Sequence, residues 1–364
     1  MRYSEYGKTG KMVSAIGFGG MRFPEPKKID EMAEIVVHAY DRGINYFDTA
    51  PGYCEDESEH IMGTAIKEIK RKAKRPFYVS SKSMKVSGDD LRRDLERSLK
   101  RLGVDTIDFY HCWYLLHPEE LDKRIAGGAI DAMVKAKEEG LINHISFSTH
   151  LPGDMICEVI ERDLFEGVLL GYSAINFRYR EEGISAAAAH NLGVVVMNSL
   201  GGGLIVQNEK AFGYLKVHKG QNMLDAALHF LLQEKRIDVR LVGFRTIDNV
   251  DTAIASADAY TPYSKEEIDT LRQGSEKRFN TLCTGCMYCR DCPVGIPVWK
   301  FMETANLLYL KGGESVHDRL TSYWGISIDE LDACTACRKC ERACTQQLPI
   351  LERFEELKQA LKAE

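Results

Sequence analysis

The stretch Tyr46-Phe47-Asp48-Thr49-Ala50 predicts a short apolar strand that ends in a carboxylate. Segments of the same kind, rich in β-branched or aromatic residues, recur along the chain up to residue 242. We expect eight strands, at residues 13–17, 46–48, 77–81, 107–110, 144–148, 168–172, 194–197 and 239–242. Eight strand–helix units in about 260 residues are typical of a (β/α)8 TIM barrel of the α/β class. A doubly wound sheet is the alternative, but no G-x-G-x-x-G motif opens a first helix.

Amphipathic segments between these strands predict the helices. The clearest covers residues 89–102, where leucines recur along one stripe and Asp89 or Asp90 is a suitable N-cap. Residues 126–139 and 225–233 show a similar periodicity, and each predicts one helix. The alternation ends after residue 257, and residues 264–274 predict a linking helix that leads into a cysteine-rich region.

Eight of the eleven cysteines lie in two runs near the end of the chain. The spacings are C-x2-C-x2-C-x2-C-P from Cys283 to Pro293 and C-x2-C-x2-C-x3-C from Cys334 to Cys344. Bacterial two-cluster ferredoxins have a similar pattern, in which the fourth cysteine of a run ligates the other cluster. We therefore expect two [4Fe–4S] clusters. The ligands of the first would be Cys283, Cys286, Cys289 and Cys344, and those of the second Cys334, Cys337, Cys340 and Cys292.

Zinc or disulfides are the alternative use of these cysteines. A zinc ribbon needs four ligands in two pairs, whereas each run here holds four evenly spaced cysteines. Thr345 stands where the ferredoxin pattern would have a proline. The spacing favours iron–sulfur clusters over both alternatives.

The patterns divide the chain into a barrel at residues 1–275 and an α-rich ferredoxin-like domain at residues 276–364. Residues 298–309 and 328–331 are expected to supply the apolar packing of the second domain. A terminal helix at residues 351–363 carries Leu351, Phe354, Leu357 and Leu361 on one face. We expect that face to dock back onto the barrel.

Composition limits the class of protein. A chain of 364 residues can bury a large core, and its net charge of −6 gives no electrostatic footprint for nucleic acid. No run of eighteen apolar residues is present, and the first residues lack the apolar core of a signal peptide. Cysteines in cluster spacing without an export signal favour a reducing cytoplasm, in an organism that tolerates oxygen poorly.

Polar residues after the second and third strands suggest a catalytic site, because barrel enzymes carry theirs at the C-terminal ends of the strands. The second strand ends in Asp48, with Tyr53 five residues beyond, and the third ends in Lys82. A nearby lysine charge lowers the pKa of a phenol, which is ordinarily about 10. Tyr53 would then donate a proton to an oxygen that receives a hydride. A purely structural ion pair between Asp48 and Lys82 is the alternative.

Several motifs are shared with one known family. They are Tyr6-Gly7-Lys8-Thr9-Gly10, the segment 43–50, Tyr53, Ser80-Ser81-Lys82, and the segments 145–148, 199–203 and 243–249. Together they resemble the aldo-keto reductases over nearly the whole chain, and the cysteine tail resembles the subgroup fused to a ferredoxin-like domain.

The resemblance implies an oxidoreductase in which Asp48, Tyr53 and Lys82 are three members of the catalytic tetrad. It also implies a nicotinamide dinucleotide site formed by Ser199, Gly201, Gly203, Gly243, Arg245 and Asn249. Ser148, at the end of the fifth strand, would hold the nicotinamide amide. Arg245 alone is placed to meet a 2′-phosphate, so NADH and NADPH are both candidates.

The fourth tetrad position departs from the family pattern, in which a histidine stands five residues after the strand-four aspartate. Counting from Asp108 places Trp113 there, with His111 two residues earlier and about 6–7 Å deeper in the barrel. His111 takes the catalytic role only if a bulge shifts the strand. The alternative is a buried, hydrogen-bonded histidine with no part in catalysis.

Three functions are compatible with these features. The first is an iron–sulfur oxidoreductase that acts on a small carbonyl-type substrate, with Tyr53 as proton donor and clusters that exchange electrons with a ferredoxin- or flavodoxin-like carrier. FMN would split the electron pair, and a barrel phosphate site can accept FMN without a motif. The second is an electron-transfer module whose barrel has become a docking scaffold. The third is an NAD(P)H carbonyl reductase with structural clusters.

Overall fold

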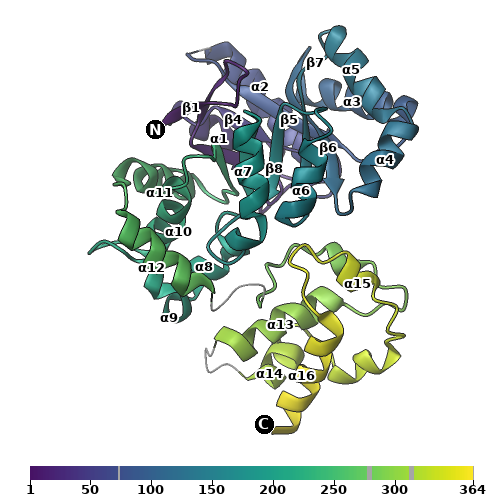
Figure 1. The fold of residues 1–364 in the computed structure, drawn as a ribbon, viewed down its shortest axis with the longest axis vertical. Coiled ribbons are helices and arrows are strands. Elements are labelled where there is room, and N and C mark those ends of the chain that lie inside the picture. Colours follow the sequence, from purple (N-terminus) through teal and green to yellow (C-terminus); the bar gives the residue numbers. More distant parts are fainter. Residues whose placement is uncertain (73, 277–280, 311–314, 364) are drawn as a thin grey trace. The chain divides into compact units, whose positions relative to one another are not determined.

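The computed structural model describes residues 1–72, 74–276, 281–310 and 315–363 (Figure 1). The chain forms two compact units. The first comprises Met1–Tyr172, Tyr179–Ser199 and Leu228–Pro262. The second comprises Ser173–Arg178, Leu200–Ala227 and Tyr263–Glu364. A domain boundary at residue 275 stays a prediction.

The first unit contains the predicted eight-stranded barrel, which closes between its last and first strands. Its parallel strands are β3 (Ile16–Gly19), β4 (Tyr46–Asp48), β5 (Tyr78–Ser83), β6 (Ile107–Leu115), β7 (Ile142–Thr149), β8 (Gly167–Gly171), β9 (Gly193–Met197) and β10 (Val239–Val242). Two short strands, β1 (Tyr3–Glu5) and β2 (Met12–Ser14), form a separate antiparallel pair. The strand predicted at 13–17 therefore spans the end of β2 and the start of β3.

Aromatic residues fill part of the barrel interior. The ring of Tyr6 lies 4.2 Å from that of Phe109, and Tyr46 lies 5.4 Å from Phe109, measured between ring centroids. A Cβ on Gly193 would come within 2.1 Å of the Tyr6 ring, so this position has to be glycine. The barrel is consequently a packed core, and its chemistry has to lie at the strand ends.

Helices alternate with the strands of the barrel. They are α1 (Ile29–Asp41), α2 (Ser58–Lys72), α3 (Gly88–Leu102), α4 (Glu119–Ala126), α5 (Ala129–Glu138), α6 (Gly153–Ile160), α7 (Glu181–Ala189) and α11 (Ile247–Ala259). Helix α10 (Met223–Leu232) is divided between the two units. Among the described residues, no helix is both long enough and apolar enough to span a membrane.

Two helix predictions need correction. The helix predicted at 126–139 begins three residues later, as α5, because Gly127 and Gly128 separate it from α4 and φ of Gly128 is +80°. The N-cap of α3 is Ser87 rather than Asp89 or Asp90, and its Oγ accepts a hydrogen bond of 3.4 Å from the Asp90 N–H. A serine hydroxyl at the N-cap satisfies one of the backbone donors that open a helix.

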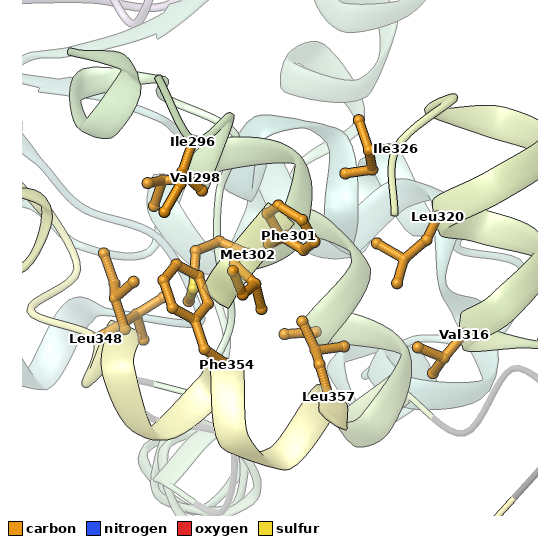
Figure 2. Packing of buried hydrophobic residues seen from close by; sticks show 13 residues of the cluster. Ile296, Val298, Phe301, Met302, Val316, Leu320, Ile326, Leu348, Phe354 and Leu357 are labelled. Carbon is orange, nitrogen blue, oxygen red and sulfur yellow. The ribbon is translucent and has the colours of Figure 1, made fainter. Parts of the chain in front are cut away.

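The cysteine-bearing part of the second unit is built from short helices. Its longer ones are α13 (Val298–Leu310) and α16 (Ile350–Ala363), with α14 (Val316–Asp318) and α15 (Lys339–Arg342) as single turns. The same unit also holds α8 (Leu204–Gln207), α9 (Glu209–Phe212) and α12 (Lys265–Glu276). The apolar residues of α13 and α16 form a hydrophobic core of their own, which Figure 2 shows.

The terminal helix packs differently from the prediction. Phe354 and Leu357 of α16 are buried in the core shared with α13, and the ring centroids of Phe301 and Phe354 lie 5.9 Å apart. The apolar face expected against the barrel thus packs inside the second unit. An amphipathic pattern predicts that a face is buried but does not name its partner.

Phe301 is fully buried at the centre of this core. Replacing it by alanine should lower the local free energy of unfolding by about 3–5 kcal/mol, because a large cavity would remain. Amide hydrogen exchange of α13 would measure the loss. Tyr323, which is 63% exposed, is the control: its alanine variant should lose less than about 1 kcal/mol. Equal exchange in both variants would contradict the packing described here.

Candidate active site and cysteine groups

Asp48 and Lys82 form a buried ion pair at the ends of β4 and β5. The Lys82 Nζ donates hydrogen bonds to the Asp48 Oδ1 at 2.6 Å and to the Thr49 carbonyl oxygen at 2.8 Å. The Ser80 hydroxyl donates to the same carboxylate oxygen at 2.6 Å. Lys82 is only 1% exposed. Burial lowers the pKa of the Lys82 ammonium, and the Asp48 carboxylate offsets part of that change.

Tyr53 lies over this ion pair. The Lys82 Nζ is 5.3 Å from the centroid of the Tyr53 ring, within the range of a cation–π interaction. The Tyr53 ring also meets Trp113 edge to face, with centroids 5.5 Å apart. The structure therefore brings together Asp48, Lys82 and Tyr53, and adds Trp113 to them.

The segment after Tyr53 has an unusual backbone. Cys54, Glu55 and Asp56 have φ values of +53°, +57° and +71°, in the left-handed region that non-glycine residues rarely adopt. Hydrogen bonds hold this segment: the Phe23 N–H donates to the Cys54 Sγ at 3.3 Å, and the Gly52 N–H donates to the Asp56 carboxylate at 2.9 Å. A conformation that costs energy at a functional position requires such support.

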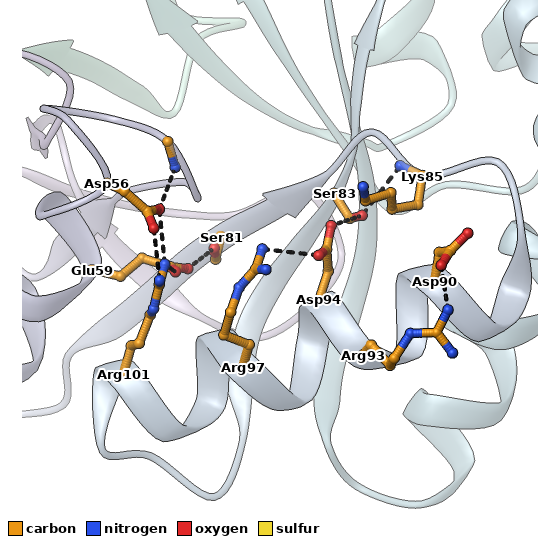
Figure 3. Close-up of polar contacts among 11 residues, drawn as sticks. Asp56, Glu59, Ser81, Ser83, Lys85, Asp90, Arg93, Asp94, Arg97 and Arg101 are labelled. Carbon is orange, nitrogen blue, oxygen red and sulfur yellow. Dashed lines mark hydrogen bonds and ion pairs between the residues drawn. The ribbon is translucent and has the colours of Figure 1, made fainter.

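Arg101 of α3 is the main support of this segment. Its two terminal nitrogens donate to the two oxygens of Asp56 at 2.8 and 2.7 Å, which is a bidentate pair (Figure 3). The Glu59 carboxylate lies 3.5 Å from the same guanidinium and accepts a hydrogen bond from the Ser81 hydroxyl on β5. The Tyr53 loop is thereby tied to both α3 and the barrel wall.

We predict that Arg101→Lys lowers kcat by about 10- to 100-fold with little change in KM, because a small displacement of a reacting group costs that much. Lysine keeps the charge but cannot make the bidentate pair. The control is Arg93→Lys on the same helix, since Arg93 is 68% exposed and pairs with the nearby Asp90. If Arg101→Lys kept full kcat, Arg101 would have no positioning role.

The pair of Arg101 and Asp56 also makes the stability of the Tyr53 loop depend on pH. The hydrogen bond from Arg101 lowers the pKa of Asp56 to about 2. A free aspartate titrates near 3.9, so the contribution of this carboxylate to stability is present above about pH 4 and is lost as the pH falls toward 2. Acid should therefore loosen the Tyr53 loop in that window.

His111 is completely buried and lies in register with Lys82 on the adjacent strand. Burial lowers the pKa of His111 well below its usual value, and the Lys82 charge lowers it further. Neither ring nitrogen has a hydrogen-bond partner of normal geometry within the described ranges. A neutral imidazole beside Lys82 is the state that these surroundings favour.

A bulge does interrupt β6, but beyond His111. Cys112 is opposite Phe147 while Leu115 is opposite Thr149, so β6 has one residue more than β7 over this interval. The extra residue re-aims the bulged segment, as bulges do. Arg124 of α4 donates to the Trp113 carbonyl oxygen at 2.7 Å and holds it. Trp113 is thus the member of this strand that meets the Tyr53 ring.

The residues expected to hold a nicotinamide dinucleotide are divided between the units. In the first unit, the buried Ser148 Oγ has no hydrogen-bond partner in the described part of the chain, whereas the Ser199 Oγ donates to the Leu241 carbonyl oxygen at 2.9 Å. Asn249 accepts a 3.3 Å hydrogen bond from the Arg245 N–H, and both residues are exposed. Gly243 follows β10 and is exposed as well.

Gly201 and Gly203 belong to the second unit, and both have positive φ, +62° and +100°. Between them, a Cβ on Gly202 would lie 2.2 Å from the carbonyl oxygen of Thr284. The main chain of the first cysteine run therefore packs directly on this glycine-rich loop. Any side chain at position 202 would clash with that carbonyl oxygen, so this position has to be glycine.

The eight cysteines of the two runs fall into two neighbouring groups. Burial raises the pKa of Cys283 well above normal, and the nearby Cys286, Cys344 and Cys289 raise it further. Burial likewise raises the pKa of Cys289 to about 12, with contributions from Cys286, Cys344 and Cys340. Cys344 therefore lies with the cysteines of the first run, although it belongs to the second.

The other group surrounds a hollow of about 340 Å³, part of which is open to solvent. Four cysteines line it: Cys292, Cys334, Cys337 and Cys340. Each group thus combines three cysteines of one run with the last cysteine of the other. The action of Cys340 on the pKa of Cys289 shows that the groups are neighbours.

The cysteines are all free thiols, and no disulfide joins them. No set of three or more His, Cys, Asp or Glu side chains within the described ranges converges closely enough to hold a single metal ion. A cubane cluster does not need its thiolates to converge on one atom, because each of its four irons binds one thiolate. The assignment of clusters to these groups stays a prediction.

Sequence reasoning missed the support of the Tyr53 loop. Asp56, Glu59 and Arg101 were not singled out, and neither were the linked Asp94 and Arg97 shown in Figure 3. The spacing of Asp56 and Glu59 after Tyr53 was a visible signal. Their common partner lies more than 40 residues further along the chain, on a helix whose polar face looked like ordinary solvated surface.

Comparison with known proteins gives a consistent picture for the barrel. The aldo/keto reductase family pattern matches residues 15–276. L-Galactose dehydrogenase of Arabidopsis thaliana is 27% identical over 279 residues, which cover 69% of this chain and 86% of that protein. D-threo-aldose 1-dehydrogenase of a Pseudomonas species is 28% identical over 236 residues, covering 55% of this chain and 70% of the relative.

Solved structures agree on the fold. The holo form of an aldo-keto reductase from Bacillus halodurans superimposes with a TM-score of 0.63 at 23% identity. The superposition covers 75% of this chain and 96% of that chain. At this identity the likeness concerns the fold alone. The family match ends at residue 276, before the first cysteine run begins.

Proposed function

This chain belongs to the aldo/keto reductase family and is an oxidoreductase of that type for a small molecule; from that premise we propose that it works with two [4Fe–4S] clusters. In this proposal Tyr53 donates a proton to the substrate oxygen, and Lys82 and Asp48 hold Tyr53 and its surroundings in place. The eight cysteines of the two runs would hold the clusters, which would supply or accept the two electrons of the reaction one at a time.

The grouping of the cysteines carries this proposal. Two sets of four thiols, each drawn from both runs, are what two cubane clusters need, and the ferredoxin spacing exchanges the fourth ligand in the same way. The first cluster would use Cys283, Cys286, Cys289 and Cys344, and the second Cys292, Cys334, Cys337 and Cys340. When bound, the clusters supply one-electron redox chemistry at these positions.

Nicotinamide has weaker support from the residues. The unpartnered Ser148 hydroxyl suits a carboxamide. The Thr284 carbonyl oxygen packs against Gly202 in the loop that the family resemblance gives to the dinucleotide. NADH and NADPH stay candidates, FMN has no motif to support it, and a ferredoxin- or flavodoxin-like carrier is the electron source that we favour.

The names of two similar enzymes support a sugar as the substrate. They are, by name, dehydrogenases of galactose and of aldoses. Small sugars and their lactones are therefore the first compounds to screen.

The second candidate function is an electron-transfer module with an inactive barrel. The observation that favours it is the position of His111, which is sealed beside Lys82 and neutral, while Trp113 takes the place beside Tyr53. The third candidate, a carbonyl reductase with structural clusters, requires nicotinamide binding.

An anaerobic titration tests the proposal. The purified protein should contain about eight irons and matching sulfide. Bleaching of its visible absorbance by NADH or NADPH would connect nicotinamide to the clusters and would direct the search to a bound flavin. Bleaching by a reduced ferredoxin alone would mean that the barrel is supplied from the cluster side. Iron-free protein that still oxidises sugars would contradict the cluster assignment.

A further inference from the structure

The two cysteine groups differ in exposure. Cys337, in the second group, is the exposed member of the eight, whereas every cysteine of the first group is at least partly buried. Beside the first group, Thr345 and Gln346 are also buried, and the Cys286 Sγ lies 3.3 Å from the Thr345 Oγ1. Of the two groups, the second is therefore the one that a partner protein could approach at Cys337.

The rim of the second group is positively charged. Thirteen residues line its hollow, and the charged ones among them are Arg338 and Lys339, both basic and both exposed. Arg342 is also exposed and donates to the Cys337 carbonyl oxygen at 3.2 Å. Glu341 pairs with Arg338 at 2.8 Å, but Lys339 has no ion-pair partner among the residues described. This positive rim stands out in a chain whose net charge is −6.

Apolar groups complete the rim. Val294 is 42% exposed and lines the same hollow together with Pro293. Basic side chains around a small apolar centre attract an acidic partner over several ångströms and give it a place to desolvate. Electron-transfer encounters use small interfaces of this kind, because rapid association and release matter more than affinity.

We infer that the rim around Cys337, formed by Arg338, Lys339, Arg342 and Val294, is the docking surface for a small acidic electron-carrier protein. The inference rests on the proposed function, because it requires a cluster on the second cysteine group. Cys292, Cys334, Cys337 and Cys340 would hold the cluster that takes up the one electron lost by the reduced carrier. The first group would hold the next acceptor, since Cys340 of the second group lies near enough to Cys289 of the first to raise the pKa of that thiol.

The test uses the cluster-loaded full chain and, as probe, a small ferredoxin of strongly negative net charge. The rate of electron transfer from the reduced ferredoxin is followed by stopped-flow absorbance at several salt concentrations. Lys339→Glu should lower the second-order rate constant about tenfold at low salt, because one attractive contact becomes repulsive. The difference from the native chain should shrink as salt screens the charges.

Lys362→Glu is the matched control. It makes the same change of net charge on the exposed end of α16, eleven residues and roughly 16 Å along the helix from Leu351 at the hollow. Its rate constant should stay within about twofold of the native value. Iron content and the extent of reduction by dithionite should be the same in all three proteins.

Two results would overturn the inference, and they are distinguishable. Iron-loaded Lys339→Glu protein that reacts as fast as the Lys362→Glu control would place the docking surface elsewhere and leave the proposed function intact. Protein without iron in every variant would overturn the proposed function, and the docking surface with it.

Discussion

Tyr53→Phe is expected to lower turnover by about 100- to 10,000-fold, which is the range that a positioned acid or base contributes. The substitution removes one oxygen atom and leaves the ring that packs on Lys82 and Trp113. Stability should therefore change little. The loss should appear in kcat with any small sugar or carbonyl compound that the native chain turns over.

The control for this experiment is Tyr3→Phe, which removes the same atom from the hairpin before the barrel, where the phenol donates to the Gly43 carbonyl oxygen at 2.8 Å. That variant should keep its kcat. A Tyr53→Phe protein with full cluster-linked activity would instead favour the reading of the barrel as a docking scaffold. Iron content, measured on both variants, separates a lost proton donor from a lost cluster.

Cys283→Ser combined with Cys344→Ser should remove one cluster and keep the other. The two cysteines lie in the same group although 61 positions separate them, so both substitutions strike a single site. Iron should fall from about eight to about four atoms per chain. If each run held its own cluster, the same double variant would damage both sites and lose nearly all of its iron.

Two further variants complete this experiment. Cys283→Ser combined with Cys334→Ser removes one ligand from each group and should therefore lose nearly all of the iron. The first double variant, in contrast, should keep about half of it. Cys157→Ser is the control, because Cys157 lies on α6, outside both runs, and is half-buried there. Its iron content should equal that of the native chain. Electron paramagnetic resonance of the reduced proteins would report which cluster remains.

The barrel could be predicted because each strand carries its own signal. The strands at 46–48 and 239–242 have the predicted bounds, since apolar β-branched or aromatic residues fill them and polar residues follow at once. Hydrophobic periodicity did not predict where one helix begins, because a tertiary contact fixes that point. A Cβ on Gly127 would lie 2.4 Å from the Val86 carbonyl oxygen, so this position has to be glycine, and the helix expected at 126–139 begins only at Ala129.

The candidate site was predictable in part for the same reason. Asp48 and Lys82 end adjacent strands, so their pairing follows from the barrel alone, and the structure has the expected ion pair. The bulge in β6 could not be foreseen, because it depends on the register with β7 rather than on residue type. The count from Asp108 nevertheless places Trp113 at the fourth tetrad position, and in the structure its ring meets that of Tyr53.

The left-handed run from Cys54 to Asp56 places stability and activity in opposition. Each non-glycine residue in that conformation costs roughly 1–2 kcal/mol, and glycine at Glu55 would relieve one such cost. A glycine there would also enlarge the set of shapes open to the unfolded and the folded loop. Relief of strain would favour the folded loop, whereas a wider set of folded shapes would hold Tyr53 less firmly, so one substitution in this short turn would act on stability and on turnover in opposite directions.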